Sequence, residues 1–211
     1  GGHYVGWWCM ALRHGSGTLT TGGTKFSGEF RHDIATGTGT LLYSQAGGGG
    51  GAAYTGTFCD SLPHGRGEMR WANGDTYTGP FVCGMRHGDD GKFEYASGDV
   101  YTGQFSRDAF DGTGTLFFAA DRTGGKKMGY HGGWRLGVFH GKGVLYLKGG
   151  RKYNGDFVMG ERHGSGEMIY GDGKSYVGEW RHGRYDGRGV LKWRSSDGTV
   201  GDYDGQWSKG M

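Results

Sequence analysis

The sequence contains little proline and cysteine and no long apolar run. Among 211 residues, 2 are Pro and 3 are Cys. So little Pro excludes a collagen triple helix and argues against a low-complexity disordered chain. Cys9, Cys59 and Cys83 are odd in number and widely spaced, so we expect no disulfide framework and a cytoplasmic, reducing setting. No run of about 18 apolar residues occurs, so no transmembrane helix is predicted.

Glycine and aromatic residues are what the chain has in excess. It contains 51 Gly, far above the usual share of about 7%, together with 7 Trp, 13 Tyr and 11 Phe. Disordered chains are poor in aromatics, so the chain is predicted to fold. Each Gly costs a helix about 1 kcal/mol relative to Ala, so long helices are disfavoured. These proportions favour a β-sheet protein without a compact globular core.

An internal repeat organises the whole chain. The pattern aromatic-x-Gly-x-aromatic occurs nine times, and in the first eight copies another Gly follows 11 residues after the opening aromatic, usually as Gly-x-Gly. We therefore predict one repeat array over residues 1–211 whose last repeat is incomplete, and we expect further repeats or flanking segments in the native chain. The repeats start near Tyr4, Phe26, Tyr54, Tyr77, Tyr101, Tyr130, Tyr153, Tyr176 and Tyr203.

Each repeat is predicted to form two short strands. Aromatics and glycines alternate with polar or small residues, which places the rings on one sheet face. Turn sequences such as 73–75 and 97–99 close the next hairpin. The predicted fold is all-β: an elongated, twisted, single-layer antiparallel meander of about 17 strands, almost without helix. We interpret the framework glycines as gaps in which a neighbouring ring lies flat on the backbone.

The repeat resembles the MORN repeat (membrane occupation and recognition nexus). The segments "YTGTFCDSLPHGRGEMRWANGD" from Tyr54 and "YNGDFVMGERHGSGEMIYGDGKS" from Tyr153 match its usual form, and the resemblance extends from Tyr4 to Trp207. Phe26 in place of the opening Tyr, Thr36 in place of His and a displaced Gly91 are departures. The resemblance implies a scaffold or dimerisation module, with a cytoskeletal or ciliary setting and a more weakly implied lipid-binding role.

The row of rings indicates a surface for a partner rather than a catalytic site. No phosphate-binding loop and no HExxH motif occur, so we expect neither an enzyme nor a cofactor. We expect a partner helix or strand to lie in a groove floored by glycine, and the open ends of the array to support self-association. The groove residues predicted are Tyr54, Phe58, Tyr77, Phe81, Tyr101, Phe105, Tyr153, Phe157, Tyr176 and Trp180.

Five histidines precede the Gly-x-Gly element at equivalent places. They are His14, His64, His87, His140 and His163, and Asp111 and Asp186 occupy the same place in other repeats. Equivalent positions lie about 10 Å apart along the array, too far for a tetrahedral zinc site within one row. We therefore expect a repeated loop hydrogen bond and no metal site, with zinc shared between chains as the alternative.

The basic residues of the sequence form one local patch. The net charge of +3 does not indicate nucleic acid, and neither edge of the array is continuously basic. The alternative function is therefore a peripheral module that binds phospholipid or phosphoinositide, and the other explanation of the patch is a solvated sheet edge. The patch comprises Arg122, Lys126, Lys127, Lys148, Arg151 and Lys152.

Overall fold

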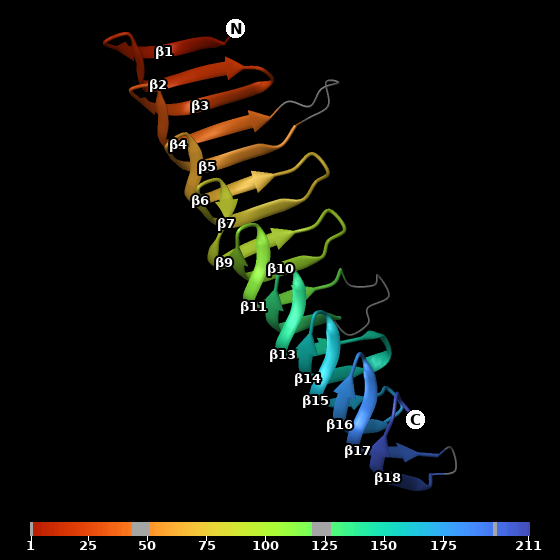
Figure 1. Ribbon diagram of the computed structural model, residues 1–211. Helices are drawn as coiled ribbons and strands as arrows, with labels where there is room; N and C mark the ends of the chain where they lie inside the picture. The colour runs from red at the N-terminus through yellow and green to blue at the C-terminus, as the bar shows by residue number, and fades with distance from the viewer. Residues whose placement is uncertain (1, 44–50, 120–127, 196–197) are drawn as a thin grey trace. The chain divides into compact units, whose positions relative to one another are not determined.

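The computed structural model describes residues 2–43, 51–119, 128–195 and 198–211 (Figure 1). These residues form 18 strands of one antiparallel sheet and one short 3-10 turn, with no helix long and apolar enough to cross a bilayer among them. The elements are β1 (His3–Cys9), β2 (Leu12–Thr21), β3 (Thr24–Arg31), β4 (Ile34–Tyr43), β5 (Ala53–Cys59), β6 (Leu62–Arg70), β7 (Thr76–Val82), β8 (Met85–Arg86), β9 (Gly88–Glu94), β10 (Val100–Ser106), β11 (Ala109–Phe117), β12 (Gly129–Arg135), β13 (Val138–Tyr146), η1 (Lys148–Gly150), β14 (Lys152–Val158), β15 (Glu161–Ile169), β16 (Ser175–Arg181), β17 (Arg184–Arg194) and β18 (Val200–Trp207).

The chain divides into two compact units. Unit 1 comprises Gly1–Gly98 and Gln104–Asp108, and unit 2 comprises Asp99–Gly103 and Ala109–Met211. Within each unit, strands that follow one another in sequence pair antiparallel, as β5 does with β6 and β14 with β15. The antiparallel meander expected from the repeat is therefore confirmed.

The fourth repeat accounts for one strand more than expected. The opening aromatic pairs with the residue 15 positions later in the third repeat, Tyr54 with Met69, but 16 positions later in the fourth, Tyr77 with Phe93. The extra residue divides the second strand of the hairpin into β8 and β9, and the His87 N–H donates to the Pro80 carbonyl at 3.1 Å where the strand is interrupted. The displaced Gly91 of the sequence thus marks a real irregularity in strand pairing.

The two strands of each repeat are joined by a tight turn, which we call the tip. Both central residues of every tip have positive φ, as at Met159 (+49°) and Gly160 (+85°). This is the type I′ hairpin turn, whose twist matches that of the strands it joins. In unit 1 the tips lie on the left side of Figure 1. The central pairs are Met10 and Ala11, His32 and Asp33, Asp60 and Ser61, Cys83 and Gly84, Arg107 and Asp108, Leu136 and Gly137, Met159 and Gly160, His182 and Gly183, and Lys209 and Gly210.

The two glycines of the Gly-x-Gly element serve different purposes. The second, Gly67 in the third repeat, has no room for a side chain, because a Cβ there would overlap the Tyr54 ring and hydroxyl. This confirms the expected contact of ring and bare backbone. The first, Gly65, has a φ of +69°, and its Cβ would meet Thr57 instead of a ring. Our interpretation was therefore wrong for the first glycine, which is required by left-handed backbone at a bulge.

Candidate functional site

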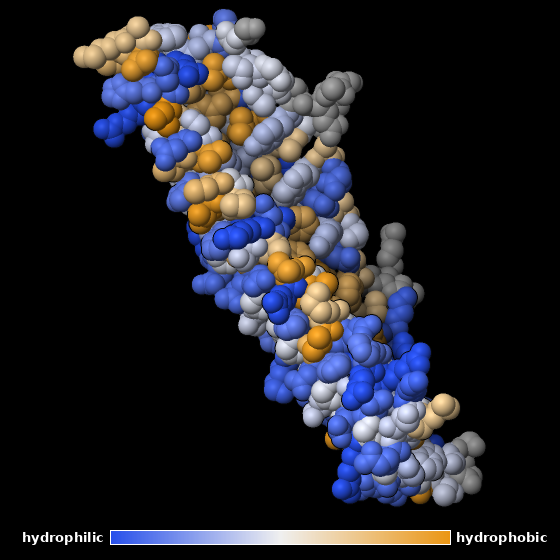
Figure 2. All heavy atoms as spheres, in the orientation of Figure 1, coloured by the Kyte–Doolittle hydropathy of each residue, from blue (hydrophilic) through white to orange (hydrophobic). Residues whose placement is uncertain are grey.

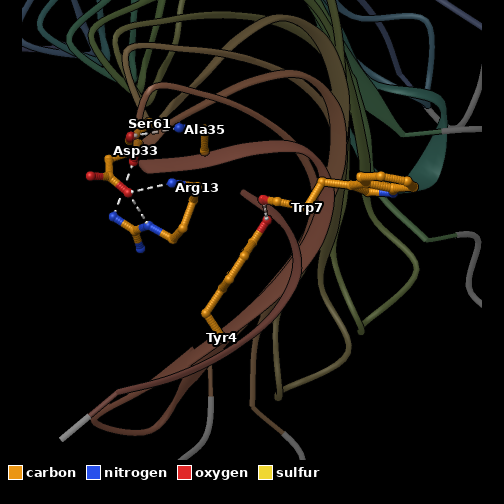
Figure 3. Close-up of polar contacts among 6 residues, drawn as sticks. All are labelled: Tyr4, Trp7, Arg13, Asp33, Ala35 and Ser61. Carbon is orange, nitrogen blue, oxygen red and sulfur yellow. Dashed lines mark hydrogen bonds and ion pairs between the residues drawn. The ribbon is translucent and has the colours of Figure 1, made fainter. Parts of the chain in front are cut away.

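The opening tyrosines share one hydrogen bond. In seven of them the hydroxyl donates to the carbonyl three residues later, over distances of 2.8 to 3.2 Å, and Figure 3 shows the bond from Tyr4 to Trp7. Burial raises the pKa of the Tyr54 and Tyr130 hydroxyls to about 12 despite these bonds, so both stay protonated donors at neutral pH. The bonds run from Tyr4, Tyr54, Tyr77, Tyr130, Tyr153, Tyr176 and Tyr203.

The rings form a ladder by edge-to-face contact within each unit. Tyr54 lies between Phe58 of its own repeat and Phe81 of the next, with centroid distances of 5.1 and 5.0 Å. In unit 2, Tyr153 lies 5.1 Å from both Phe157 and Trp180. These distances fall in the range that aromatic pairs prefer. We call the sheet face that carries these rings the ladder face and the opposite one the outer face.

The structure places all ten predicted groove residues in this ladder. Their side chains are between 0 and 5% exposed. A partner in contact with these rings would have to displace side chains that the array itself has packed. The exposed surface around the ladder is formed instead by the residues of the tips and of the outer face.

A second row of residues follows the ladder, and the sequence analysis missed it; five of its eight members contact a tyrosine ring. Each is the second residue of the strand that follows a tip, and we call it the lid. In unit 2 most lids are rings stacked on the tyrosine, such as Phe139 on Tyr130 at 3.8 Å. In unit 1 the Arg86 guanidinium lies 5.7 Å from the Tyr77 ring. The lids are Arg13, Ala35, Pro63 and Arg86 in unit 1, and Phe110, Phe139, Arg162 and Tyr185 in unit 2.

Each tip is bound to the lid of the preceding hairpin. The second tip residue donates its N–H to the lid carbonyl, over 2.8 to 3.0 Å, from Asp33 to Arg13 in unit 1 and from Gly160 to Phe139 in unit 2. In unit 1 the Asp33 carboxylate also accepts the N–H of Arg13, at 2.9 Å, and its guanidinium Nε, at 2.7 Å (Figure 3). Successive hairpins are thereby fixed to one another by their backbones.

The acids at the predicted histidine positions bind the backbone as expected. The Asp111 carboxylate accepts the Leu136 N–H at 3.2 Å, and that of Asp186 accepts the Lys209 N–H at 3.5 Å, so a loop hydrogen bond is confirmed for these two. The Nδ1 atoms of His14 and His140 are buried without a hydrogen-bond partner, so no such bond is seen for them. No group of three or more metal-ligating side chains is found in the described part of the chain.

The predicted basic patch is described only in part. Arg122, Lys126 and Lys127 lie outside the described residues. Of the others, the Arg151 Nε donates to the Lys148 carbonyl at 3.0 Å, and the Lys152 ammonium lies 5.8 Å from the Tyr146 ring. Lys148 and Arg151 are exposed, while Lys152 is half-buried. Lys148 and Arg151 thus occupy the turn between β13 and β14, and Lys152 begins β14.

Apolar side chains at the tips of unit 1 form a second surface feature. The first residue after each tip is apolar and between 36 and 46% exposed in four successive hairpins. We call these residues, Leu12, Ile34, Leu62 and Met85, the tip row. At the equivalent positions of unit 2, Ala109 and Val138 are half-buried and Glu161 and Arg184 are charged. Figure 2 shows apolar side chains, in orange, among hydrophilic ones on the face turned to the viewer.

A family model described as MORN repeat matches seven segments: residues 26–45, 54–76, 101–120, 130–150, 153–175, 176–198 and 203–211. The repeats that start at Tyr4 and Tyr77 lie outside these segments, yet both have the tyrosine hydrogen bond. Such arrays are generally non-catalytic and engage proteins or membranes. A comparison with curated proteins finds no match.

Proposed function

The chain belongs to the MORN repeat family, and from this premise we propose that it is a non-catalytic scaffold that binds other proteins and assembles with them. The proposed setting is a cytoskeletal or ciliary structure, which rests on the resemblance alone. The ladder uses its rings and hydroxyls for its own packing, which leaves the outer surfaces for recognition. Self-association through the ends of the array remains part of this proposal.

The tip row is the observation that carries the proposal. Neighbouring hairpins are two strands apart, about 10 Å, so the row presents an apolar side chain at that interval. Residues seven apart in an α-helix are separated by about 10.5 Å along its axis. A partner helix lying along the row could therefore place one apolar residue against each hairpin of unit 1.

Proximity labelling of the full-length protein in its cell tests this function. One variant replaces the tip row (Leu12→Ser, Ile34→Ser, Leu62→Ser, Met85→Ser), and a control replaces exposed apolar residues of unit 2 (Val158→Ser, Met159→Ser, Val177→Ser). We expect the tip-row variant to lose a set of labelled proteins that the control keeps, with both thermal midpoints close to the original. Identical labelled sets for all three proteins would contradict the proposal.

A second candidate function is binding to anionic lipid. The exposed Lys148 and Arg151 in one turn favour it, since each basic residue near an anionic surface contributes about 1 kcal/mol. Flotation with phosphoinositide vesicles should then be lost in a variant with Lys126→Glu, Lys127→Glu, Arg151→Glu and Lys152→Glu. Absence of flotation for the unmodified protein would eliminate this candidate.

A further inference from the structure

Two tips bring together histidines from rows that the sequence analysis considered separately. In unit 2 the ring centre of His163 lies 5.7 Å from that of His182, and in unit 1 that of His14 lies 5.1 Å from that of His32. We call these contacts the histidine pairs. In each pair one histidine precedes a Gly-x-Gly element and the other is the first central residue of the next tip. The separation of about 10 Å within one row therefore does not apply between the two rows.

The fold holds each histidine pair at the junction of two successive hairpins. The Gly183 N–H donates to the Arg162 carbonyl at 3.0 Å, which fixes the neighbours of His182 and His163 against one another. The equivalent backbone bond lies beside the pair of unit 1, over the same distance. The two aspartates that stand in place of the first histidine accept the N–H of the first residue of the next tip. Side chains at this place thus face the following tip.

The spacing of the rings matches that of two imidazoles bound to one metal ion. When two imidazoles bind one tetrahedral Zn²⁺ through nitrogens about 2.1 Å from it, their ring centres are about 5.3 Å apart. The distances of 5.7 and 5.1 Å in the histidine pairs lie on either side of this value. The ring planes are inclined by 81° and 62°. Neither pair is therefore stacked in parallel, an arrangement in which lone pairs within the two ring planes could not converge on one ion.

A carboxylate places the proton of His182 so that its other ring nitrogen can bind a metal. The Nδ1 atom of His182 lies 2.8 Å from Glu161 Oε2. An ionised carboxylate only accepts, so Nδ1 donates its proton and Nε2 carries the free lone pair. A carboxylate bonded in this way to a ligating histidine orients the ring and raises its basicity. In unit 1 the neighbour of His32, Asp33, is bonded to Arg13 instead.

The charged groups beside the pair of unit 2 are compatible with a bound cation. The Arg181 Nε atom lies 3.5 Å from the Asp186 carboxylate, which offsets its charge. Arg162 turns to the ladder face, where its guanidinium lies 4.5 Å from the Trp180 ring. The Glu161 carboxylate is in contact with the pair itself and attracts a cation there.

We propose that His163 and His182 together bind a divalent transition-metal ion, with Zn²⁺ as the fitting example, and that the pair of unit 1 binds the same class of ion more weakly. Imidazole nitrogens suit Zn²⁺, and water completes its four-coordinate shell. Glu161 is a positioning residue, which holds the His182 ring without binding the ion. Two protein ligands are fewer than the four of a structural zinc site, so the ion exchanges with solution. Once bound, it joins a tip to the preceding hairpin.

The test titrates Zn²⁺ into the isotope-labelled full chain and follows the ring nitrogens of its 9 histidines by NMR. The signals of His163 and His182 should shift together, at a lower Zn²⁺ concentration than those of the pair in unit 1. In His163→Ala the His182 signals should no longer shift at that concentration, and in His182→Asn the same should hold for His163. Asn is chosen because it tolerates the positive φ of the tip. Glu161→Gln should weaken binding about tenfold.

The matched control is His140→Ala, which truncates the equivalent residue of the preceding repeat, where the next tip begins with Met159. It should leave Zn²⁺ binding at His163 and His182 unchanged. Zn²⁺ should also raise the thermal midpoint of the unmodified chain and of this control, but not that of His182→Asn.

Two results would overturn the proposal as a whole. One is that Zn²⁺ shifts neither histidine of the unmodified chain, and the other is that the His182 signals shift equally in His163→Ala. Affinity unchanged by Glu161→Gln would remove the positioning role of Glu161. A rise in the sedimentation mass of the unmodified chain with Zn²⁺, absent from His182→Asn, would show that the ion is shared between two chains, which contradicts a site within one chain.

Discussion

The tips of the two units are bound to the preceding hairpin by different contacts. In unit 1, the second tip residue is Asp33, Ser61 or Asp108 in three of four hairpins that follow another, and its side chain accepts the N–H of the preceding lid. In unit 2 that residue is always Gly, at 137, 160, 183 and 210, so it has no side chain to accept the lid N–H. Its tips keep the backbone bond, and side chains of the preceding hairpin add bonds to three of them, from Asp111, Arg162 and Asp186. Unit 1 accepts the strain of positive φ in exchange for a second bond. Unit 2 avoids the strain at this second tip position and stacks rings on three of its tyrosines.

The comparison shows that the ladder is constant while its cover varies. In unit 1, Arg13 lies over Phe30 at 5.4 Å and Arg86 over Tyr77 at 5.7 Å, while the other two lids are Ala35 and Pro63. Three of the four lids of unit 2 are rings stacked on a tyrosine. A tyrosine face accepts either a cation or a ring, because its quadrupole attracts both a positive charge and a ring edge or an offset ring. The cover can therefore change between units without loss of the fold.

The largest effect should come from the ladder and should be equal in the two units. Tyr54→Ala and Tyr153→Ala each remove a ring that is 0% exposed, which should cost about 3 to 5 kcal/mol of unfolding free energy. Denaturant unfolding of the full chain, with hydrogen exchange to assign each unit, measures both. If the two losses of unfolding free energy differ by more than about 1 kcal/mol, the ladder does not stabilise the two units equally.

Lids should matter more in unit 2. Phe139→Ala removes a ring stacked 3.8 Å from Tyr130 and should destabilise by about 2 to 3 kcal/mol. Pro63→Ala in unit 1 should cost about 0.4 to 1 kcal/mol, chiefly through the entropy of the unfolded chain. The same unfolding experiment compares the two variants. Equal losses of unfolding free energy would show that aromatic and non-aromatic lids contribute equally to stability.

Exchanging tip residues should transfer the second bond between units. A Cβ at Gly160 meets nothing within 4 Å, so a side chain fits there. Gly160→Ala should cost about 1 kcal/mol because of its positive φ. Gly160→Asp should cost less, because its carboxylate can accept the N–H of Phe139 as Asp33 accepts that of Arg13. If the two variants melt at the same temperature, the side-chain bond contributes nothing measurable.

Phe26 of unit 1 lacks the hydroxyl that the opening tyrosines have, and adding it should stabilise the protein. Phe26 replaces the opening Tyr and directs its Cζ toward Gly28 and Gly39, as the tyrosines direct their hydroxyls toward their own glycines. Phe26→Tyr should restore the bond to the carbonyl three residues later and stabilise the protein by about 1 kcal/mol. The reverse change Tyr54→Phe is the matched control and should destabilise by a similar amount. A lower midpoint for Phe26→Tyr would mean that the second repeat has no room for the hydroxyl.

The smallest expected effect is on the stability of the protein at low pH. The hydrogen bond from the Arg13 side chain, followed by that from its backbone, holds the pKa of Asp33 below its usual 3.8. Because this pKa is lowered on folding, the stabilisation is fully present above pH 3.8 and is lost as pH falls through the lower folded value. Asp33→Asn should therefore flatten the loss of stability below pH 3.8. A pH titration of the urea midpoint measures the slope, and an unchanged slope would remove Asp33 from the acid response.

The meander and its ladder were predictable because they repeat. The 11-residue interval and the alternation of Tyr and Gly recur in successive repeats, so each copy confirms the others. The lids were missed because Arg, Ala, Pro, Phe and Tyr share no residue type at that position. A signal did exist: each lid is the second residue after a two-residue tip. The tip row was missed because its members lie one to a hairpin and come together only through the pairing of successive strands.

The sequence by itself determined the repeat, the strand alternation and the residues of the ladder. These follow from periodicity, since a period of two places rings and glycines on one face. Only the tertiary structure decided that the rings are closed to solvent, because rings of neighbouring repeats and several lids pack against them. It also decided which side chains remain on the surface, such as the tip row, because exposure depends on neighbours that are distant in sequence.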